Sequence, residues 1–194
     1  MIRVLIFGDD AGERRAIEDA VRSVSPDADV ISTDESSEEL CIDGYDKSKR
    51  VQIKTFGEFA VFADGKPVDF RYSKSLELFA LIVDRRGKKV DNGMIKRMLW
   101  QESDREADHS SYISTLKKEI VQTFSARGIT DIFRQEDHSI SLVIDRVECD
   151  YFDYVEDKNG SMKFDGRYME QYSWAESTAG LLYSISEYRK KISR

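Results

Sequence analysis

The stretch SKSLELFALIVDRRGKKVDNGMIKRMLW (residues 73–100) contains two apolar patterns with helical spacing, one on each side of Gly87. In the first pattern, Ser73 is a candidate N-cap, and a broad apolar face follows over residues 76–83. In the second, a helix starts at Asn92 and ends near Trp100, with its apolar residues turned inward. The stretch therefore predicts a core helix followed closely by a second, shorter helix.

Two further elements are predicted on the carboxyl side of this stretch. A third helical pattern runs from about His109 to about Ala126, with one apolar and one hydrophilic face, and Gly128 ends it. Residues 131–145 then alternate between apolar and polar around the tripeptide Glu136-Asp137-His138. This alternation predicts a β-hairpin with a polar tip.

The residues ahead of the stretch have strand character. From Val51 onward, apolar residues occupy every second position, and the pair Asp64-Gly65 is typical of a tight turn between strands. We predict a small antiparallel sheet here. The order of sheet, three helices and hairpin over residues 51–146 predicts a domain of the α+β class.

This ordered set resembles the C-terminal effector domain of OmpR/PhoB-type response regulators, a winged helix-turn-helix preceded by a small sheet. The segments that carry the resemblance are FGEFAVFADGKPVDF, KSLELFALIVDRRGKKVD, IKRMLW, YISTLKKEI and the hairpin. The TFGEF opening, a CDYFDY segment (149–154) and a GRYMEQYSWAE segment (166–176) look like the SARP-related regulators of Gram-positive bacteria. The resemblance implies a bacterial transcription regulator of a two-component type.

In such regulators a receiver precedes the winged helix, and residues 1–44 are interpreted as a truncated or degenerate receiver-like element. The run RVLIFGDD (residues 3–10) has the character of a buried strand and ends in Asp9 and Asp10, which match the acidic pair that holds magnesium in receivers. A helix and a short strand (29–33) follow. No phosphoacceptor is identified, because the winged helix begins before five strands are complete. We expect a vestigial pair, no bound metal and a role in dimerisation or docking; alternatively, the pair simply precedes a helix N-terminus with favourable dipole placement.

A polar linker is predicted at residues 45–50, and an aromatic and helical tail at residues 147–194. The last helix is expected over residues 177–192, with cations near its C-terminus. Aromatic residues are dense between residues 151 and 174, but acidic residues lie among them and would repel a nucleic acid strand. We therefore interpret them as a packing layer that joins the tail to the winged helix.

The resemblance also implies a mode of binding to double-stranded DNA. The third helix would enter the major groove and the hairpin wing would reach the neighbouring minor groove. Trp100 is one of the predicted DNA-binding residues, and the alternative interpretation is that its indole caps the core. The predicted DNA-binding residues are Trp100, Ser110, Ser111, Ser114, Thr115, Lys117, Lys118, Arg134 and His138.

The sequence departs from its relatives at two places that matter for DNA. Ser114 and Thr115 stand where relatives usually place arginines, and Gln135, Glu136 and Asp137 stand where they have a basic wing. Both changes weaken phosphate and guanine binding. This leaves open an adaptor that binds RNA polymerase or another regulator. A basic stripe would instead favour DNA, its expected members being Lys96, Arg97, Lys117, Lys118 and Arg134.

Charge and contact number bear on how DNA would be bound. The formal net charge is −7, which argues against indiscriminate coating of nucleic acid, because phosphate affinity comes from Lys and Arg. Basic pairs nevertheless gather within residues 71–118. One recognition helix with two lysines supplies few contacts, so we expect a homodimer.

Other classes of function lack support in the sequence. No Walker loop, GxGxxG, HExxH or nucleophile elbow occurs, so no enzymatic activity and no cofactor are predicted. Cys41 and Cys149 form no metal-binding motif, and His109 and His138 are expected to be exposed polar residues rather than a catalytic pair. No apolar stretch reaches the ~20 residues of a membrane span, which favours a cytoplasmic protein without a membrane partner.

Overall fold

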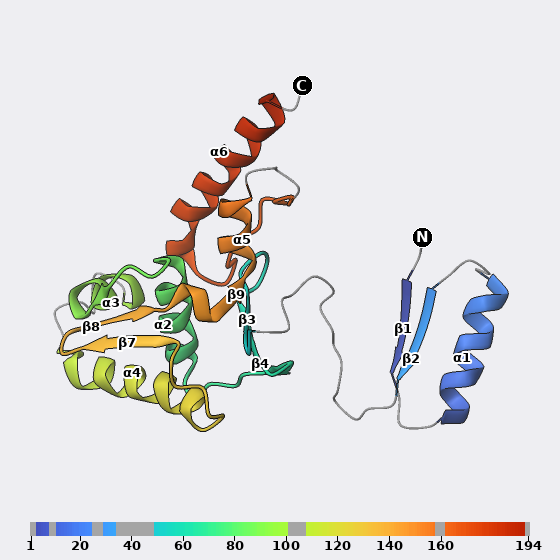
Figure 1. Ribbon diagram of the computed structural model, residues 1–194, viewed down its shortest axis with the longest axis horizontal. Helices are drawn as coiled ribbons and strands as arrows, with labels where there is room; N and C mark the ends of the chain where they lie inside the picture. The colour runs from blue at the N-terminus through green and yellow to red at the C-terminus, as the bar shows by residue number, and fades with distance from the viewer. Residues whose placement is uncertain are drawn as a thin grey trace. The chain divides into compact units, whose positions relative to one another are not determined.

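The computed structural model of the chain describes residues 3–7, 11–24, 29–33, 49–100, 108–157 and 162–192. The chain divides into two units, residues 1–42 and 43–194, and each is described by itself (Figure 1).

The first unit is a strand, a helix and a strand, as the sequence predicts. Strand β1 (Arg3–Phe7) pairs in parallel with β2 (Asp29–Thr33), and α1 (Ala11–Val24) connects them. Parallel neighbours need such a crossover connection. The pair Asp9 and Asp10 lies outside the described residues, and so does most of the predicted linker.

The second unit opens with the predicted antiparallel sheet. Strand β3 (Val51–Lys54) pairs with β4 (Ala60–Ala63), and β4 pairs with β5 (Lys66–Pro67). The turn between β4 and β5 has positive φ at both Asp64 (52°) and Gly65 (77°), which is the geometry that this residue pair favours. Val51 and Ile53 are buried and alternate with more exposed neighbours, so the predicted period is confirmed.

A fourth strand joins this sheet from the segment assigned to the tail. Strand β9 (Val147–Cys149) follows the short 3-10 helix η2 (Ile144–Arg146) and pairs in parallel with β3, giving the order β5-β4-β3-β9. The predicted tail (residues 147–194) therefore begins with a strand of this sheet. The boundary predicted at residue 146 does not separate two packed bodies.

The three predicted helices are α2 (Ser73–Asp84), α3 (Asn92–Leu99) and α4 (Ser110–Ser125). Ser73 is the first helical residue, and its neighbour Tyr72 occupies the N-cap without a side-chain hydrogen bond, so the predicted cap was one residue late. Helix α2 stops where Arg86 (φ 46°) and Gly87 (φ 76°) enter the left-handed region. Figure 1 shows the three helices gathered beside the hairpin.

The hairpin forms part of a second, three-stranded sheet. Strand β7 (Phe133–Glu136) pairs with β8 (Ser139–Leu142), and β8 also pairs with β6 (Val90–Asp91). Asp137 and His138 form the turn at the tip. Because β6 leads directly into α3, the hairpin is attached to the start of that helix.

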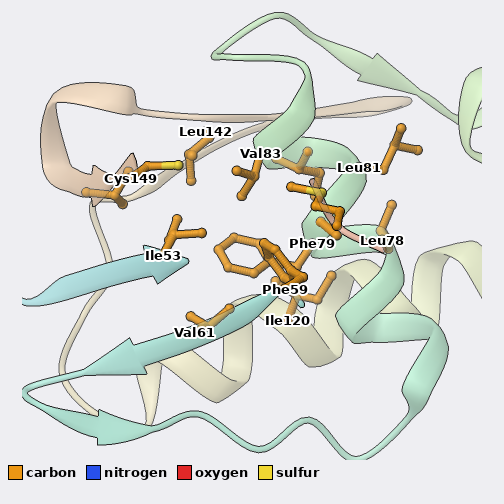
Figure 2. Close-up of a cluster of buried hydrophobic side chains, with 14 of the residues drawn as sticks. Ile53, Phe59, Val61, Leu78, Phe79, Leu81, Val83, Ile120, Leu142 and Cys149 are labelled. Atoms are coloured by element: carbon orange, nitrogen blue, oxygen red, sulfur yellow. The ribbon is translucent and has the colours of Figure 1, made fainter. Parts of the chain in front are cut away.

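The core centres on Phe79, which is fully buried on α2. Its ring lies 6.0 Å from that of Phe59, 5.4 Å from that of Phe124 on α4 and 5.7 Å from that of Phe133 on β7, between ring centroids. Figure 2 shows side chains from the strands, α2 and α4 meeting around Phe79. Phe79 thus packs against the segment between β3 and β4, against helix α4 and against strand β7.

The tail packs on the same unit, and aromatic side chains make the join. Helix α5 (Asp150–Glu156) begins with Asp150, whose carboxylate accepts hydrogen bonds from the backbone N–H of Thr55 (2.9 Å) and Phe56 (3.0 Å). The buried aromatic residues include Tyr151, Phe152, Tyr154 and Tyr168. The expected packing layer is therefore confirmed.

The last helix, α6 (Glu176–Ile192), follows the 3-10 helix η3 (Ser173–Ala175) and matches the predicted element. Leu182 is buried, and Arg189 donates to the carbonyls of Tyr154 (2.9 Å) and Asp157 (2.6 Å). Only part of the predicted apolar face is covered, because Leu181 and Tyr188 remain 56% and 66% exposed. Figure 1 shows α6 extending beyond the rest of the unit.

We expect Phe79→Ala to lower the free energy of unfolding by roughly 3–5 kcal/mol, because it leaves a cavity where four aromatic rings meet. Urea unfolding followed by circular dichroism measures this change. Leu181→Ala is the matched control, since that side chain is largely exposed and its loss should change little. Equal effects of the two substitutions would contradict the proposed centre of the core.

A second prediction concerns Asp84 at the end of α2, which accepts a hydrogen bond from the Tyr168 hydroxyl at 3.0 Å. Burial raises the pKa of Asp84 above its ordinary value of 3.8, although hydrogen bonds from Thr178 and Tyr168 act in the opposite direction. The Asp84 carboxyl therefore binds a proton more tightly in the folded protein than in the unfolded chain. The protonated Asp84 carboxyl thus contributes stability that is complete below the pKa of this group in the unfolded chain and is lost as the pH rises through its pKa in the folded protein.

The variant Asp84→Asn stays neutral and keeps an oxygen for the Tyr168 hydroxyl. Its free energy of unfolding relative to the natural protein should therefore increase as the pH is raised from 3.5 towards 7, and then level off. Urea titrations at a series of pH values test this. A difference between the two proteins that does not change with pH would show that burial does not disfavour the carboxylate.

Candidate nucleic-acid interface

Helix α4 has one buried and one exposed face. Ile113, Leu116, Ile120 and Phe124 recur at helical spacing and are buried in the core. The predicted DNA-binding residues Ser110, Ser111, Ser114, Thr115 and Lys118 are exposed on the other side. The predicted orientation of this helix is confirmed.

Two hydroxyl groups of the exposed face are oriented by the helix itself. The Ser114 hydroxyl donates to the carbonyl of Ser110, and the Thr115 hydroxyl donates to the carbonyl of Ser111, both at 3.0 Å. Each oxygen keeps lone pairs that point outward. In this arrangement the two hydroxyls are acceptors, suited to the amino groups that adenine and cytosine present in the major groove.

The two lysines of α4 differ. Lys118 is exposed, whereas Lys117 is half-buried and its ammonium donates to Asn92 Oδ1 on α3 at 2.6 Å. Burial lowers the pKa of Lys117, and the nearby charge of Asp91 opposes that shift. Among the other members of the expected basic stripe, Arg97 and Arg134 are exposed and Lys96 is half-buried.

An aromatic cluster marks the junction of α3 and α4. The indole of Trp100 stacks on the His109 ring (centroids 4.3 Å apart, 15° between planes) and meets the edge of Tyr112. The Lys74 ammonium lies 5.8 Å from the indole centroid and donates to the carbonyl of Leu99 at 2.6 Å. Trp100 is half-buried against the core, which favours its capping role, and His109 is half-buried rather than exposed.

The acidic tip of the wing is partly neutralised within the protein. The Lys89 ammonium donates to the Glu136 carboxylate at 2.7 Å, and this hydrogen bond lowers the pKa of Glu136. Asp137 and His138 are exposed at the turn. The hairpin therefore presents fewer uncompensated carboxylates than its composition suggests.

A second acidic group stands at the start of α4. The Asp108 carboxylate accepts the backbone N–H of Ser110 at 2.9 Å, and hydrogen bonding from Ser110 lowers the pKa of Asp108. A carboxylate in this position suits the helix dipole. It also adds negative charge beside the exposed hydroxyls.

Residues outside the predicted set position the ends of the helices. Asp91 caps α3 by accepting the N–H of Met94 at 2.8 Å. Arg50 binds Asp64 with two hydrogen bonds of 2.7 Å and donates to the carbonyls of Arg127 (2.8 Å) and Gly128 (3.1 Å), just beyond α4. The sequence gives a cap signal at Asp91, but the partners of Arg50 are too distant along the chain to be inferred.

Metal chemistry and membrane insertion find no counterpart in the residues described. In that part of the chain, no group of three or more His, Cys, Asp or Glu side chains is placed to hold a metal ion. Likewise, none of the helices described combines the length and the apolar character needed to cross a membrane.

No protein-family model and no curated protein matches the chain. A solved structure, that of Mycobacterium tuberculosis EmbR in complex with a low-affinity phosphopeptide, is similar with a TM-score of 0.58 and 17% sequence identity. EmbR is a SARP-family transcription regulator with a winged-helix domain. The match covers 71% of this chain but 43% of the EmbR chain, so it spans less than half of that protein. At this identity the likeness concerns the fold, and it supports a winged-helix-like arrangement in a mixed α+β chain.

We expect Asp91→Ala to lower the free energy of unfolding by about 1 kcal/mol, because it removes the side-chain cap of α3. Asp91→Ser keeps a capping oxygen and serves as the control. Thermal and urea unfolding of both variants measure the effect. The cap assignment would be refuted by an alanine variant as stable as the serine variant.

Proposed function

We propose that the chain is a transcription regulator that binds double-stranded DNA through α4 and the β7–β8 wing. The observation that carries this proposal is the exposed polar face of α4 beside the hairpin, with the opposite face buried in the core. A helix held in this way can enter the major groove. The fold similarity to EmbR supports a regulator as the class of protein.

Each part of this surface has a distinct task in the proposal. Ser114 and Thr115 accept hydrogen bonds from base edges, and Lys118 binds a phosphate. Arg134 and His138 on the wing approach the neighbouring backbone or minor groove. Because Lys117 is half-buried, α4 presents one exposed lysine, so a single copy binds weakly, and a homodimer that meets two half-sites supplies the missing contacts.

We further propose a cytoplasmic location and a docking or dimerising role for residues 1–42. That unit has the strand-helix-strand order of a receiver's beginning. In this interpretation it brings two copies together without a phosphorylation step.

A second candidate function is an adaptor that binds a protein such as RNA polymerase or another regulator. The observation in its favour is the acidic character of the surface, where Asp108 and Asp137 are exposed beside α4 and at the wing tip. Carboxylates at these positions repel phosphate. An adaptor would not bind duplex DNA even at low salt.

Fluorescence anisotropy with a random-sequence duplex, measured over a series of salt concentrations, tests the proposal. For the natural protein we expect affinity to fall steeply with salt, and Lys118→Ala should reduce the log–log slope by about one because one phosphate contact is lost. Lys66→Ala, which removes an exposed lysine of β5 in the other sheet, should leave the slope unchanged.

The outcomes separate the two candidates. Loss of slope in the Lys118 variant alone assigns the contact to α4. A folded protein that shows no affinity for duplex at low salt would exclude the DNA proposal and leave the adaptor.

A further inference from the structure

Asn92 touches both elements of the proposed DNA-binding surface. It directly follows β6 and is the first residue of α3. Its backbone N–H donates to the carbonyl of His138 at the wing tip (3.1 Å), and its side-chain oxygen accepts from the Lys117 ammonium of α4 (2.6 Å). One residue thus joins the wing to the recognition helix.

We propose that Asn92 is a positioning residue that fixes the wing relative to α4 and withholds Lys117 from DNA phosphates. The inference rests on the proposed DNA-binding function and adds to it which of the two lysines contributes charge to binding.

The Lys117 side of this link is an ammonium hydrogen-bonded inside the protein. The N–O distance of 2.6 Å is short even for a bond with a charged donor, and the side chain is half-buried between α4 and α3. Moving the ammonium to a phosphate would leave the Asn92 oxygen without this donor. In this proposal the hydrogen bond to Asn92 keeps Lys117 on the protein when DNA approaches, whereas Lys118 is exposed on α4.

The wing side of the link uses the backbone. Asp91 pairs with Ser139 in the β6–β8 ladder, and the next residue, Asn92, bonds the carbonyl of His138. A substitution at position 92 other than proline keeps this N–H. Side-chain variants of Asn92 therefore remove the Lys117 contact and leave the wing contact in place.

This arrangement has a consequence for affinity. A lysine that binds a phosphate adds similar affinity for every sequence, so it strengthens specific and non-specific binding alike and leaves their ratio unchanged. Holding Lys117 on Asn92 removes one such contribution from both kinds of binding. Discrimination between sequences rests instead on the hydroxyls of Ser114 and Thr115, which in this proposal meet base edges.

The test compares the salt dependence of duplex binding for four full-length proteins: the natural chain, Lys117→Ala, Asn92→Ala and the double variant. Lys117→Ala should keep the natural slope, because this lysine binds no phosphate. Asn92→Ala should steepen the slope by about one, because the released ammonium reaches the DNA. The double variant should return to the natural slope, which a mere loosening of the wing would not produce.

Two results would overturn the inference while the DNA proposal stands: a slope reduced by about one in Lys117→Ala, or an unchanged slope in Asn92→Ala. Urea unfolding of each variant verifies that it is folded. If the natural protein does not bind duplex at all, the inference fails together with the proposed function.

Nitrogen-15 NMR of the lysine ammonium groups separates these failures. A slowly exchanging Lys117 signal in the natural protein that disappears in Asn92→Ala shows that the Asn92 contact exists, whatever the DNA result. The same fast exchange in both proteins would overturn the contact itself.

Discussion

The second unit depends on the burial of Phe79, because this side chain is where helices and strands of both sheets meet. Its ring packs against Phe124 of α4 and Phe133 of β7, so the third helix and the wing share one support. The rotation of α4 follows from this contact. A helix that places Phe124 inward must turn Ser114 and Lys118 outward, and the candidate interface is therefore a consequence of the core.

Local patterns in the sequence predicted the elements of this fold well, because helical and strand periods depend on near neighbours. The apolar period of residues 76–83, the helix start at Asn92 and the hairpin predicted from the alternation over residues 131–145 all have their counterparts in the structure. The place of β9 beside β3 was missed. That pairing joins Val147 to Val51 across most of the unit, and a three-residue strand carries little periodic signal.

The candidate site shows the same division between what is local and what is distant. Exposure of Ser110, Ser114 and Lys118 follows from the helical period alone. The partners of charged groups do not follow from the helical period. Lys117 meets Asn92 and Glu136 meets Lys89 only after the helices and the hairpin have packed, so counting lysines and carboxylates along the sequence overestimates both the free positive and the free negative charge of the surface.

The Arg50 guanidinium connects the residues just before β3 to the residues just after α4. It lies immediately before β3 and binds the carbonyls of Arg127 and Gly128 while Asp64 holds it in place. The fold therefore does not begin at its first strand. A shortened chain that starts at Val51 would retain every strand and helix of the unit, yet the carbonyls of Arg127 and Gly128 would lose the donor that Arg50 supplies, so a truncation that spares every regular element would still weaken the turn after α4.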